Sequence, residues 1–233
     1  MKAKARIVSV LCVALALAGC GRRPPEASYR YKLTLSVNTP GGAKTASTVV
    51  EDDYPTSHLP YSTTGQALYL DLGPGKKPLI ALLGHLRRQW EVNGKHAVWG
   101  YDSPLNIIWR ACGMGVSGHD DVEDIRLINA RCNDAYQLTA ADLPDLVTFA
   151  DVNDPKSLQL VDPNDLQATL GADVSWKSMS IVLTKEPITS GIEQNLKWIG
   201  RMRSPGFNID LPGVKDQNGL DAAISYSAFV SED

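Results

Sequence analysis

Cys20 closes the sequence Leu17-Ala18-Gly19-Cys20, and its position predicts covalent lipid attachment. Basic residues open the chain, an apolar run spans residues 7–17, and small residues come directly before the cysteine. This order is that of a secretory signal peptide, and the run is shorter than the ~20 apolar residues that a membrane-spanning helix needs. Cleavage before Cys20 would leave its thiol at the new N-terminus, ready for acylation. We therefore expect a signal peptide over residues 1–19 and a palmitate-bearing lipid anchor at Cys20, as in bacterial lipoproteins.

The residues after the cysteine indicate where such an anchor would hold the protein. Gly21, and not Asp, follows Cys20, which by analogy with lipoprotein sorting in enteric bacteria favours the outer membrane, with the protein facing the periplasm. Residues 20–28 are predicted to form a short tether, stiffened by prolines, whose Arg22 and Arg23 can lie near anionic lipid headgroups. The alternatives for the first 20 residues are an ordinary cleavable signal and a buried N-terminal helix.

Two cysteines remain for the folded part, since Cys12 leaves with the signal and Cys20 takes the lipid. In an exported protein, the remaining pair, Cys112 and Cys132, predicts one disulfide bond. The alternatives are two buried free thiols or part of a metal site. A zinc site built from both cysteines and His119 lacks an evident fourth ligand.

The segment between these cysteines has the glycine spacing of a dinucleotide-binding loop. Residues 113–118 read Gly-Met-Gly-Val-Ser-Gly and follow an expected strand over residues 107–111. A pyrophosphate binds at the positive N-terminal end of a helix, but here that end would carry Asp120 and Asp121, whose carboxylates repel it. We therefore interpret the segment as a glycine-rich loop and expect no cofactor.

The acidic run over residues 119–124 could hold a divalent cation, because carboxylates with one imidazole suit calcium, manganese or zinc. Its spacing does not fit a calcium loop of the EF-hand type, which needs acids at alternate positions and a glycine at the sixth. A solvated acidic turn, or the first turn of a helix, explains the run without a metal. We expect no metal site here.

Nucleophilic catalysis has no clear signature in the chain. Ser117 lies in Gly-Val-Ser-Gly, which differs from the Gly-x-Ser-x-Gly elbow of hydrolases. His58, His85, His96 and His119 are scattered, so sequence distance cannot test a triad. No catalytic residue is assigned, and an envelope hydrolase is kept as the alternative function.

The charge balance excludes one class of partner. Loss of residues 1–19 removes three of the 23 basic residues and none of the 26 acidic ones, which leaves a formal charge of about −6. Phosphate binding needs a basic patch, and none is found in the chain, so nucleic acid is not expected as a partner. The content of 43% hydrophobic and 21% charged residues is that of an ordinary globular protein.

Strands and tight turns dominate the first half of the chain. Alternation over residues 29–37 predicts a strand, which the turn at residues 39–42 connects to a second strand over residues 45–51. A second hairpin is expected from residues 67–72 and 78–83. Asn93-Gly94 predicts a third, between residues 90–92 and 95–99, with Trp90 opposite Ala97 and Trp99 diagonal to them on the same face.

The second half is expected to carry short capped helices between strands. Asp162 with Pro163 predicts a helix over residues 163–170, ended by Gly171. Ser190 and Glu193 form a capping box for a helix over residues 191–199, whose Ile192, Leu196 and Ile199 would pack into a core. Strands are predicted over residues 174–184 and 222–230.

Two stretches resemble a family of uncharacterised proteobacterial envelope proteins. The first is residues 37–51 with their Thr-Pro-Gly-Gly turn, and the second is residues 149–198. In the second stretch the resemblance is carried by Asp151, Asn153-Asp154-Pro155, Ser157, Val161-Asp162-Pro163, Leu166, Thr189, Gly191-Ile192-Glu193 and Leu196-Lys197-Trp198. The family has no assigned activity, so the resemblance implies a shared fold and no catalytic residue.

The sequence predicts an α+β fold that is strand-rich, with antiparallel hairpins and a few short capped helices in a single globular domain over residues 29–233. We expect a binding or structural role on the membrane, with an unknown envelope protein or small ligand as partner. The aromatic residues Trp90, Trp99, Tyr101 and Trp109 form the candidate contact surface, although core packing would account for at least two of the tryptophans.

Overall fold

The computed structural model describes most of the chain from residue 25 onward. The described residues are 25–54, 62–83, 89–92, 95–98, 104–114, 121–140, 142–204, 207–215 and 221–232. For residues 89–92, 95–98, 121, 211–215 and 221–222 the backbone alone is described.

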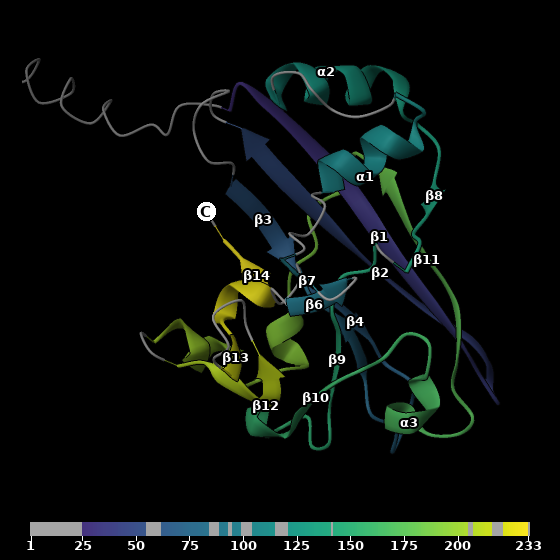
Figure 1. Ribbon diagram of the computed structural model, residues 1–233, viewed down its shortest axis with the longest axis vertical. Helices are drawn as coiled ribbons and strands as arrows, with labels where there is room; N and C mark the ends of the chain where they lie inside the picture. The colour runs from purple at the N-terminus through teal and green to yellow at the C-terminus, as the bar shows by residue number, and fades with distance from the viewer. Residues whose placement is uncertain are drawn as a thin grey trace, which may run out of the picture.

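Strands make up most of the regular structure among these residues (Figure 1). The strands are β1 (Ala27–Thr39), β2 (Gly42–Tyr54), β3 (Ser62–Gln66), β4 (Leu68–Leu70), β5 (Leu79–Ala81), β6 (Gln89–Val92), β7 (Lys95–Val98), β8 (Tyr136–Gln137), β9 (Leu146–Phe149), β10 (Leu158–Leu160), β11 (Ser175–Leu183), β12 (Ile209–Lys215), β13 (Asp221–Ile224) and β14 (Val230–Ser231). The α-helices are α1 (Pro104–Ala111), α2 (Asp121–Arg131) and α3 (Leu166–Leu170). The 3₁₀ helices are η1 (Pro155–Ser157), η2 (Ile192–Gln194), η3 (Ile199–Arg203) and η4 (Tyr226–Ala228).

The strands form two larger sheets and two isolated hairpins. The larger sheets have the orders β14-β3-β2-β1-β11-β8 and β10-β9-β5-β4, and the hairpins are β6-β7 and β12-β13. Every described strand pair is antiparallel. The prediction of a strand-rich fold of antiparallel strands is therefore confirmed.

The long hairpin of β1 and β2 is the centre of the six-stranded sheet. Its register runs from Ala27 opposite Tyr54 to Thr39 opposite Gly42, and Gly42 has a φ of 101°, which favours glycine. Alternate side chains of β1 are buried on one face, as the period of a half-buried strand requires: Tyr29, Tyr31, Leu33, Leu35 and Val37. The predicted hairpin is confirmed, but β1 begins at Ala27, so two of its residues come from the predicted tether.

At Gly65, strand β3 approaches β2 closely. A Cβ at Gly65 would lie 3.1 Å from both Cα and Cγ2 of Val50, and Gly65 has a φ of 150°. Both the space and the backbone conformation therefore favour glycine at this position.

The second predicted hairpin, β4 and β5, is also confirmed, with Leu70 opposite Leu79. Strand β5 is buried on both faces, because Leu79 and Ala81 belong to one hydrophobic cluster and Ile80 belongs to the other. An apolar run without alternation is typical of a strand covered on both sides. The backbone register of the third hairpin, β6 and β7, places Trp90 opposite Ala97 as predicted.

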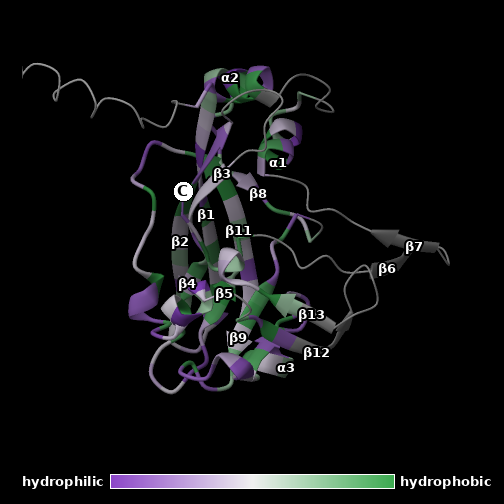
Figure 2. Cartoon of the chain, turned by 90° about the vertical axis from the view of Figure 1, so that its left-hand side faces the viewer, coloured by the Kyte–Doolittle hydropathy of each residue, from purple (hydrophilic) through white to green (hydrophobic). Residues whose placement is uncertain are grey.

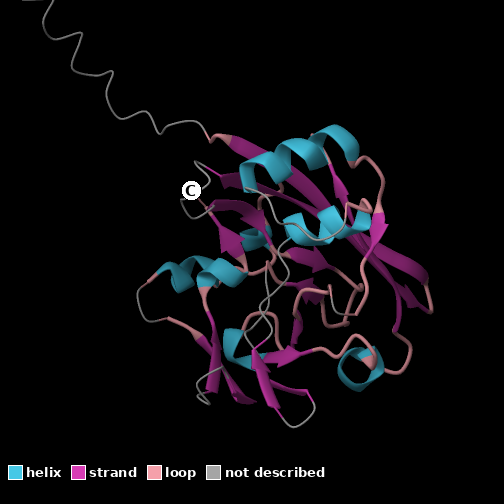
Figure 3. Ribbon diagram, turned by 45° about the horizontal axis from the view of Figure 1, so that its top comes forward, coloured by secondary structure: helices cyan, strands magenta, loops and turns pink. Residues whose placement is uncertain are grey.

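Helices α1 and α2 lie together at one end of the six-stranded sheet (Figures 1 and 3). The strand expected over residues 107–111 is wrong, since these residues belong to α1. Leu105, Ile108 and Trp109 are buried at the i, i+3, i+4 spacing of a helix face. Directly after the two helices, Cys112 and Cys132 form a disulfide with a Cα–Cα distance of 5.8 Å, which confirms the predicted bond.

A second hydrophobic cluster fills the space between the four-stranded sheet, the 3₁₀ helices and the β12-β13 hairpin. At its centre, the rings of Phe149 and Trp198 lie 5.2 Å apart and those of Trp198 and Phe229 lie 5.7 Å apart, both edge to face. The Trp198 Nε1–H donates to the carbonyl of Val152 at 2.7 Å. Apolar residues concentrate along the strands, whereas much of the connecting chain is polar (Figure 2).

The predicted helix over residues 163–170 begins later than expected. Its N-cap is Asp165, whose side chain accepts a hydrogen bond from the Ala168 amide at 3.2 Å. Asp162 instead accepts one from the Asn164 amide at 2.8 Å, which closes a turn before the helix. Gly171 ends the helix as predicted, with a φ of 109°.

The predicted helix over residues 191–199 is wrong. The segment forms η2, and a turn then leads into η3. At its start, Gly191 has a φ of 100°, and the side-chain oxygen of Gln66 accepts a hydrogen bond from the backbone amide of Ile192 at 2.9 Å. No side-chain cap is therefore needed from Ser190. The apolar residues of this segment, Ile192, Leu196 and Ile199, do pack into the core as expected.

The strand predicted over residues 174–184 is confirmed as β11, but the one over residues 222–230 is interrupted. Strand β13 ends at Ile224, η4 follows, and β14 then pairs with β3, with Val230 opposite Gln66. Within the strand predicted over residues 222–230, the chain therefore leaves the β12-β13 hairpin and joins the six-stranded sheet. Phe229, which directly follows η4, packs into the second cluster, where it is fully buried.

Candidate functional site

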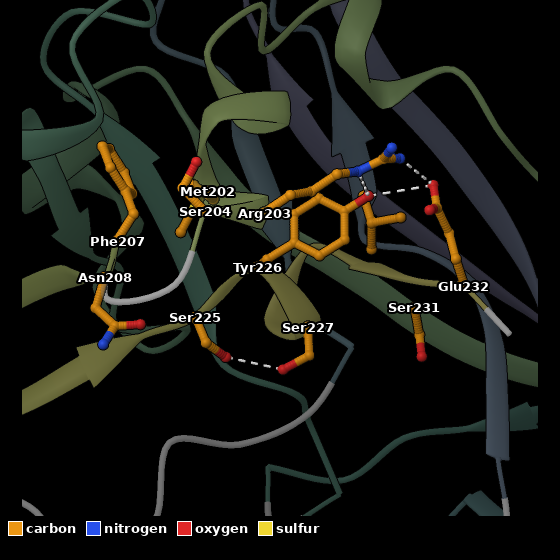
Figure 4. A pocket seen from close by; sticks show the side chains of 11 residues that line it. Met202, Arg203, Ser204, Phe207, Asn208, Ser225, Tyr226, Ser227, Ser231 and Glu232 are labelled. Carbon is orange, nitrogen blue, oxygen red and sulfur yellow. Dashed lines mark hydrogen bonds and ion pairs between the residues drawn. The ribbon is translucent and has the colours of Figure 1, made fainter.

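A shallow hollow lies between η3, the start of β12, η4 and the last described residues of the chain (Figure 4). Its volume is about 580 Å³, which is within the range of small-ligand pockets. The lining combines apolar and polar side chains: Met202, Arg203, Ser204, Phe207, Asn208, Ser225, Tyr226, Ser227, Val230, Ser231 and Glu232.

The local structure explains why these side chains reach one place. In η3, Ile199 and Met202 are buried while the neighbouring Arg203 is exposed. Residues three apart lie on the same side of a 3₁₀ helix, so burial of the first two turns Arg203 outward. Helix η4 presents Tyr226, and the pairing of β14 with β3 carries the chain on to Glu232.

Three polar side chains form a closed triangle at one side of the hollow. The guanidinium Nη2 of Arg203 lies 2.6 Å from Oε1 of Glu232, and its Nε donates to the hydroxyl of Tyr226 at 3.0 Å. The Tyr226 hydroxyl in turn donates to Glu232 Oε1 at 3.1 Å. Arg203 and Glu232 are both more than half exposed, so the ion pair contributes little to stability.

Arg203 and Tyr226 both have raised pKa values. The hydrogen bond with Tyr226, followed by the nearby negative charge, raises the pKa of Arg203. Burial raises the pKa of Tyr226, against the opposing effect of Arg203. At neutral pH the hollow therefore presents a guanidinium cation and a neutral phenol.

Opposite the triangle, the hydroxyls of Ser225 and Ser227 lie 2.8 Å apart (Figure 4). A serine becomes a nucleophile when an adjacent base takes its proton, and a second serine hydroxyl is too weak a base for this task. The protonated Tyr226 cannot serve as a base either. The geometry of these residues therefore suits hydrogen bonding to a polar ligand and not nucleophilic attack.

A second polar cluster lies inside the protein. Asp52 is only 2% exposed and accepts hydrogen bonds from the hydroxyls of Tyr29 at 2.6 Å and Thr63 at 2.7 Å. Burial raises the pKa of Asp52, although both hydrogen bonds oppose the shift. Burial also raises the pKa of Tyr29 well above its ordinary value. Because Asp52 and Tyr29 are both buried, we interpret the cluster as a structural feature and not a ligand site.

Of the four residues of the candidate contact surface, only Trp109 has a described side chain. Trp109 is 3% exposed and belongs to the first hydrophobic cluster, so it does not lie on a surface. This outcome follows from its place on the inner face of α1. Trp90 is described by its backbone only, and Trp99 and Tyr101 lie outside the described residues.

The acidic run over residues 119–124 spans the start of α2. Glu123 is exposed and Asp124 is fully buried, so these neighbouring carboxylates point to different sides of the helix. His119 and Asp120 lie outside the described residues. Within the part of the chain that the structure describes, no group of three or more histidine, cysteine or acidic side chains could hold a metal ion.

Several other predicted residues cannot be placed. Cys20, Ser117, His58 and His85 lie outside the described residues, and His96 is described by its backbone only. In the described chain, no helix has the length and apolar character to cross a membrane.

Sequence reasoning missed the hollow because its residues form no recognised motif. They come from residues 202–208 and 225–232, which only the tertiary fold brings together. The one local signal was Ser225-Tyr226-Ser227, a polar interruption of the closing strand predicted over residues 222–230.

Comparison with known proteins gives no match for this chain. No family model matches it, and neither do any of the curated proteins or solved structures that were compared with it.

Proposed function

We propose that this protein is a lipid-anchored binding protein of the bacterial envelope, held on the membrane through Cys20. Its fold is assigned to the α+β class, with helices gathered at the ends of antiparallel sheets. It belongs with the uncharacterised proteobacterial envelope proteins that it resembles. Gly21 after the lipidated cysteine favours the outer membrane, with the folded part facing the periplasm.

The observation that carries this proposal is the place of the Leu-Ala-Gly-Cys motif relative to the fold. The motif ends at Cys20, and among the described residues the first backbone contact to the sheet is made by the Glu26 amide, which donates to the Tyr54 carbonyl at 2.9 Å. A lipid on Cys20 would thus be joined to the fold by a very short tether. This is the arrangement expected when the cysteine anchors a folded domain and does not belong to its core.

The disulfide between Cys112 and Cys132 supports export, because such bonds persist in the periplasm and are rare in the cytosol. Cys132 is 1% exposed and the bond joins the ends of two helices, as in a structural disulfide.

The hollow beside Arg203 supports a role in binding. It offers a guanidinium, a phenol hydroxyl and two serine hydroxyls above an apolar floor that includes Met202. A few convergent polar groups over apolar lining are the usual make-up of a small-ligand site. The alternative, an envelope hydrolase, needs an activated nucleophile, and the contact between Ser225 and Ser227 does not supply one.

Lipidation can be tested in the bacterium with the full chain. Globomycin, which inhibits the lipoprotein signal peptidase, should make the precursor accumulate, and Cys20→Ser should abolish both acylation and membrane retention. Cys12→Ser is the matched control, since it removes a thiol from the same segment but not from the cleavage motif. Recovery of Cys20→Ser in the membrane fraction with the wild-type mature mass would refute the proposal.

A further inference from the structure

We infer that the outer side of α2 faces the membrane and that its arginines contact anionic lipid headgroups. The surface concerned, called the α2 patch below, consists of Arg126, Leu127, Ala130 and Arg131. This inference rests on the proposed lipidation of Cys20, because the lipid determines which end of the protein is held near the bilayer.

The tether is too short to let the protein turn over. From Cys20 to Glu26, where the backbone first joins the sheet, a fully extended chain spans at most about 22 Å. Strand β1 has 13 residues, which corresponds to a length of about 43 Å. The end of β1 that carries Ala27 therefore stays near the membrane, and the end that carries Thr39 points away from it.

Helix α2 lies at the membrane-proximal end of β1. The Asn129 side-chain amide donates to the Ser28 carbonyl at 2.9 Å, and the Arg126 guanidinium lies 3.7 Å from the Glu26 carboxylate. Figures 1 and 3 show the helix beside the beginning of this strand. Few surfaces of the fold lie as close to the point where the tether joins it.

The exposure of the α2 side chains shows which side of the helix is available. Val122, Ile125 and Ile128 are buried and belong to the first hydrophobic cluster. On the other side, Arg126, Ala130 and Arg131 are exposed, and Leu127 is half-buried. Two cations thus flank a small apolar strip, a combination that suits contact with the headgroup layer of an anionic membrane.

The distribution of charge favours the same orientation. Four exposed acids lie around the β9–β10 connection and before α3, at the end opposite α2 (Figures 1 and 2): Asp151, Asp154, Asp162 and Asp165. With a mature formal charge of about −6, the protein as a whole is repelled by an anionic surface. The repulsion is weakest when the acidic end points away from the membrane and the arginines of α2 point toward it.

Three exposed acids, Glu26, Glu123 and Asp134, also lie near the patch. Glu26 lies beside Arg126, but the pair is 62% and 48% exposed at a distance of 3.7 Å, so lipid phosphate can readily replace the carboxylate. Glu123 lies three residues before Arg126, on the same side of α2, and the exposed Asp134 follows Arg131 by three residues, so both reduce the positive charge near the patch. In the sequence of the tether, Arg22 and Arg23 compensate for this charge.

The test uses the full lipidated chain, purified from membranes and reconstituted in vesicles of phosphatidylcholine with 30 mol% phosphatidylglycerol. An Ala130→Cys variant carries a fluorophore on the α2 patch, and an Ala43→Cys variant carries it on the exposed β1-β2 hairpin end. A quencher attached to lipid headgroups should quench the label at position 130 strongly and the label at position 43 weakly.

Charge substitutions separate the patch from the tether. Arg126→Ala with Arg131→Ala should weaken the docked state about fivefold for each arginine removed, which reduces quenching at position 130 and weakens its dependence on salt. Lys156→Ala with Lys177→Ala removes the same charge from exposed positions far from α2 and should leave quenching unchanged.

The outcomes distinguish this inference from the proposed function. If the chain does not float with the vesicles, lipidation is refuted and the inference fails with it. If the chain floats but position 43 is quenched as strongly as position 130, lipidation stands and the orientation is refuted. Equal effects of the arginine and lysine pairs would refute the contact between the α2 patch and the headgroups.

Discussion

Replacing the buried carboxylate of Asp52 should change the stability of the protein in a pH-dependent way. Asp52→Ala leaves the hydroxyl of Tyr29, itself 2% exposed, without its acceptor, and removes the acceptor of Thr63 as well. Loss of these hydrogen bonds to a charged group should cost about 3 kcal/mol, which corresponds to a fall in Tm of about 6–12 °C for a protein of this size.

The more informative variant is Asp52→Asn, which keeps one acceptor oxygen and removes the charge. Because burial raises the pKa of Asp52 in the folded protein, the native state binds the proton more tightly than the unfolded chain does. The stabilisation that this proton gives the folded protein is fully present below the pKa that Asp52 has in the unfolded chain. It is lost as the pH rises through the pKa that Asp52 has in the folded protein. The wild type should therefore gain stability relative to Asp52→Asn as the pH is lowered toward 4.

Urea denaturation of both proteins between pH 4 and pH 8 measures this difference directly. Asp53→Asn is the matched control, because it removes the same charge from the neighbouring position of β2, which is less buried. A difference between wild type and Asp52→Asn that stays constant over this range, or that grows as the pH rises, would refute the assignment of a raised pKa to Asp52.

Three further predictions concern the disulfide, a tight glycine and the acidic run. Replacing Cys112 and Cys132 by alanine should lower the free energy of unfolding by about 3 kcal/mol in the chain-entropy model, whereas two alkylatable thiols in unreduced periplasmic protein would contradict the bond. Gly65→Ala should cost more than 1 kcal/mol in urea denaturation, while the control Gly200→Ala, which has open space around it, should change stability little; equal effects would refute the argument from close packing. Calcium, manganese or zinc should leave Tm unchanged, and a saturable rise that is lost on mutating residues 119–124 would reveal a metal site there.

The parts of the fold that could be predicted are those in which local pattern and tertiary burial agree. The sequence of β1 alternates between apolar and polar residues from Tyr29 to Val37, and a glycine ends the turn that follows, so the β1-β2 hairpin was predictable. The disulfide could be predicted because the protein is expected to be exported and because only two cysteines remain for its folded part. The hairpin required no knowledge of residues far away in the chain, whereas the disulfide required the N-terminal motif and the cysteines of the whole sequence.

The wrong predictions of secondary structure arose where a short apolar run fits both the two-residue period of a strand and the 3.6-residue period of a helix. Residues 107–111 could be a strand, but Pro104 at the first turn and the spacing of Leu105, Ile108 and Trp109 fit a helix face. Gln66, whose side chain accepts a hydrogen bond from the Ile192 amide, is 126 residues away from Ile192 in the sequence, so the segment around Ile192 gave no local signal of this contact. The hollow beside Arg203 was unpredictable for the same reason, since its two walls meet only in the folded chain.

The pairing of β14 with β3 has a consequence for how the chain folds. Val230 lies opposite Gln66, so β3 keeps one hydrogen-bonding edge open until a segment far along the chain has paired with it. An open edge can pair with another copy of the chain, and a contact between such distant residues forms slowly. This sheet is therefore complete only after β14 has paired, and a chain without β14 would leave β3 open to aggregation.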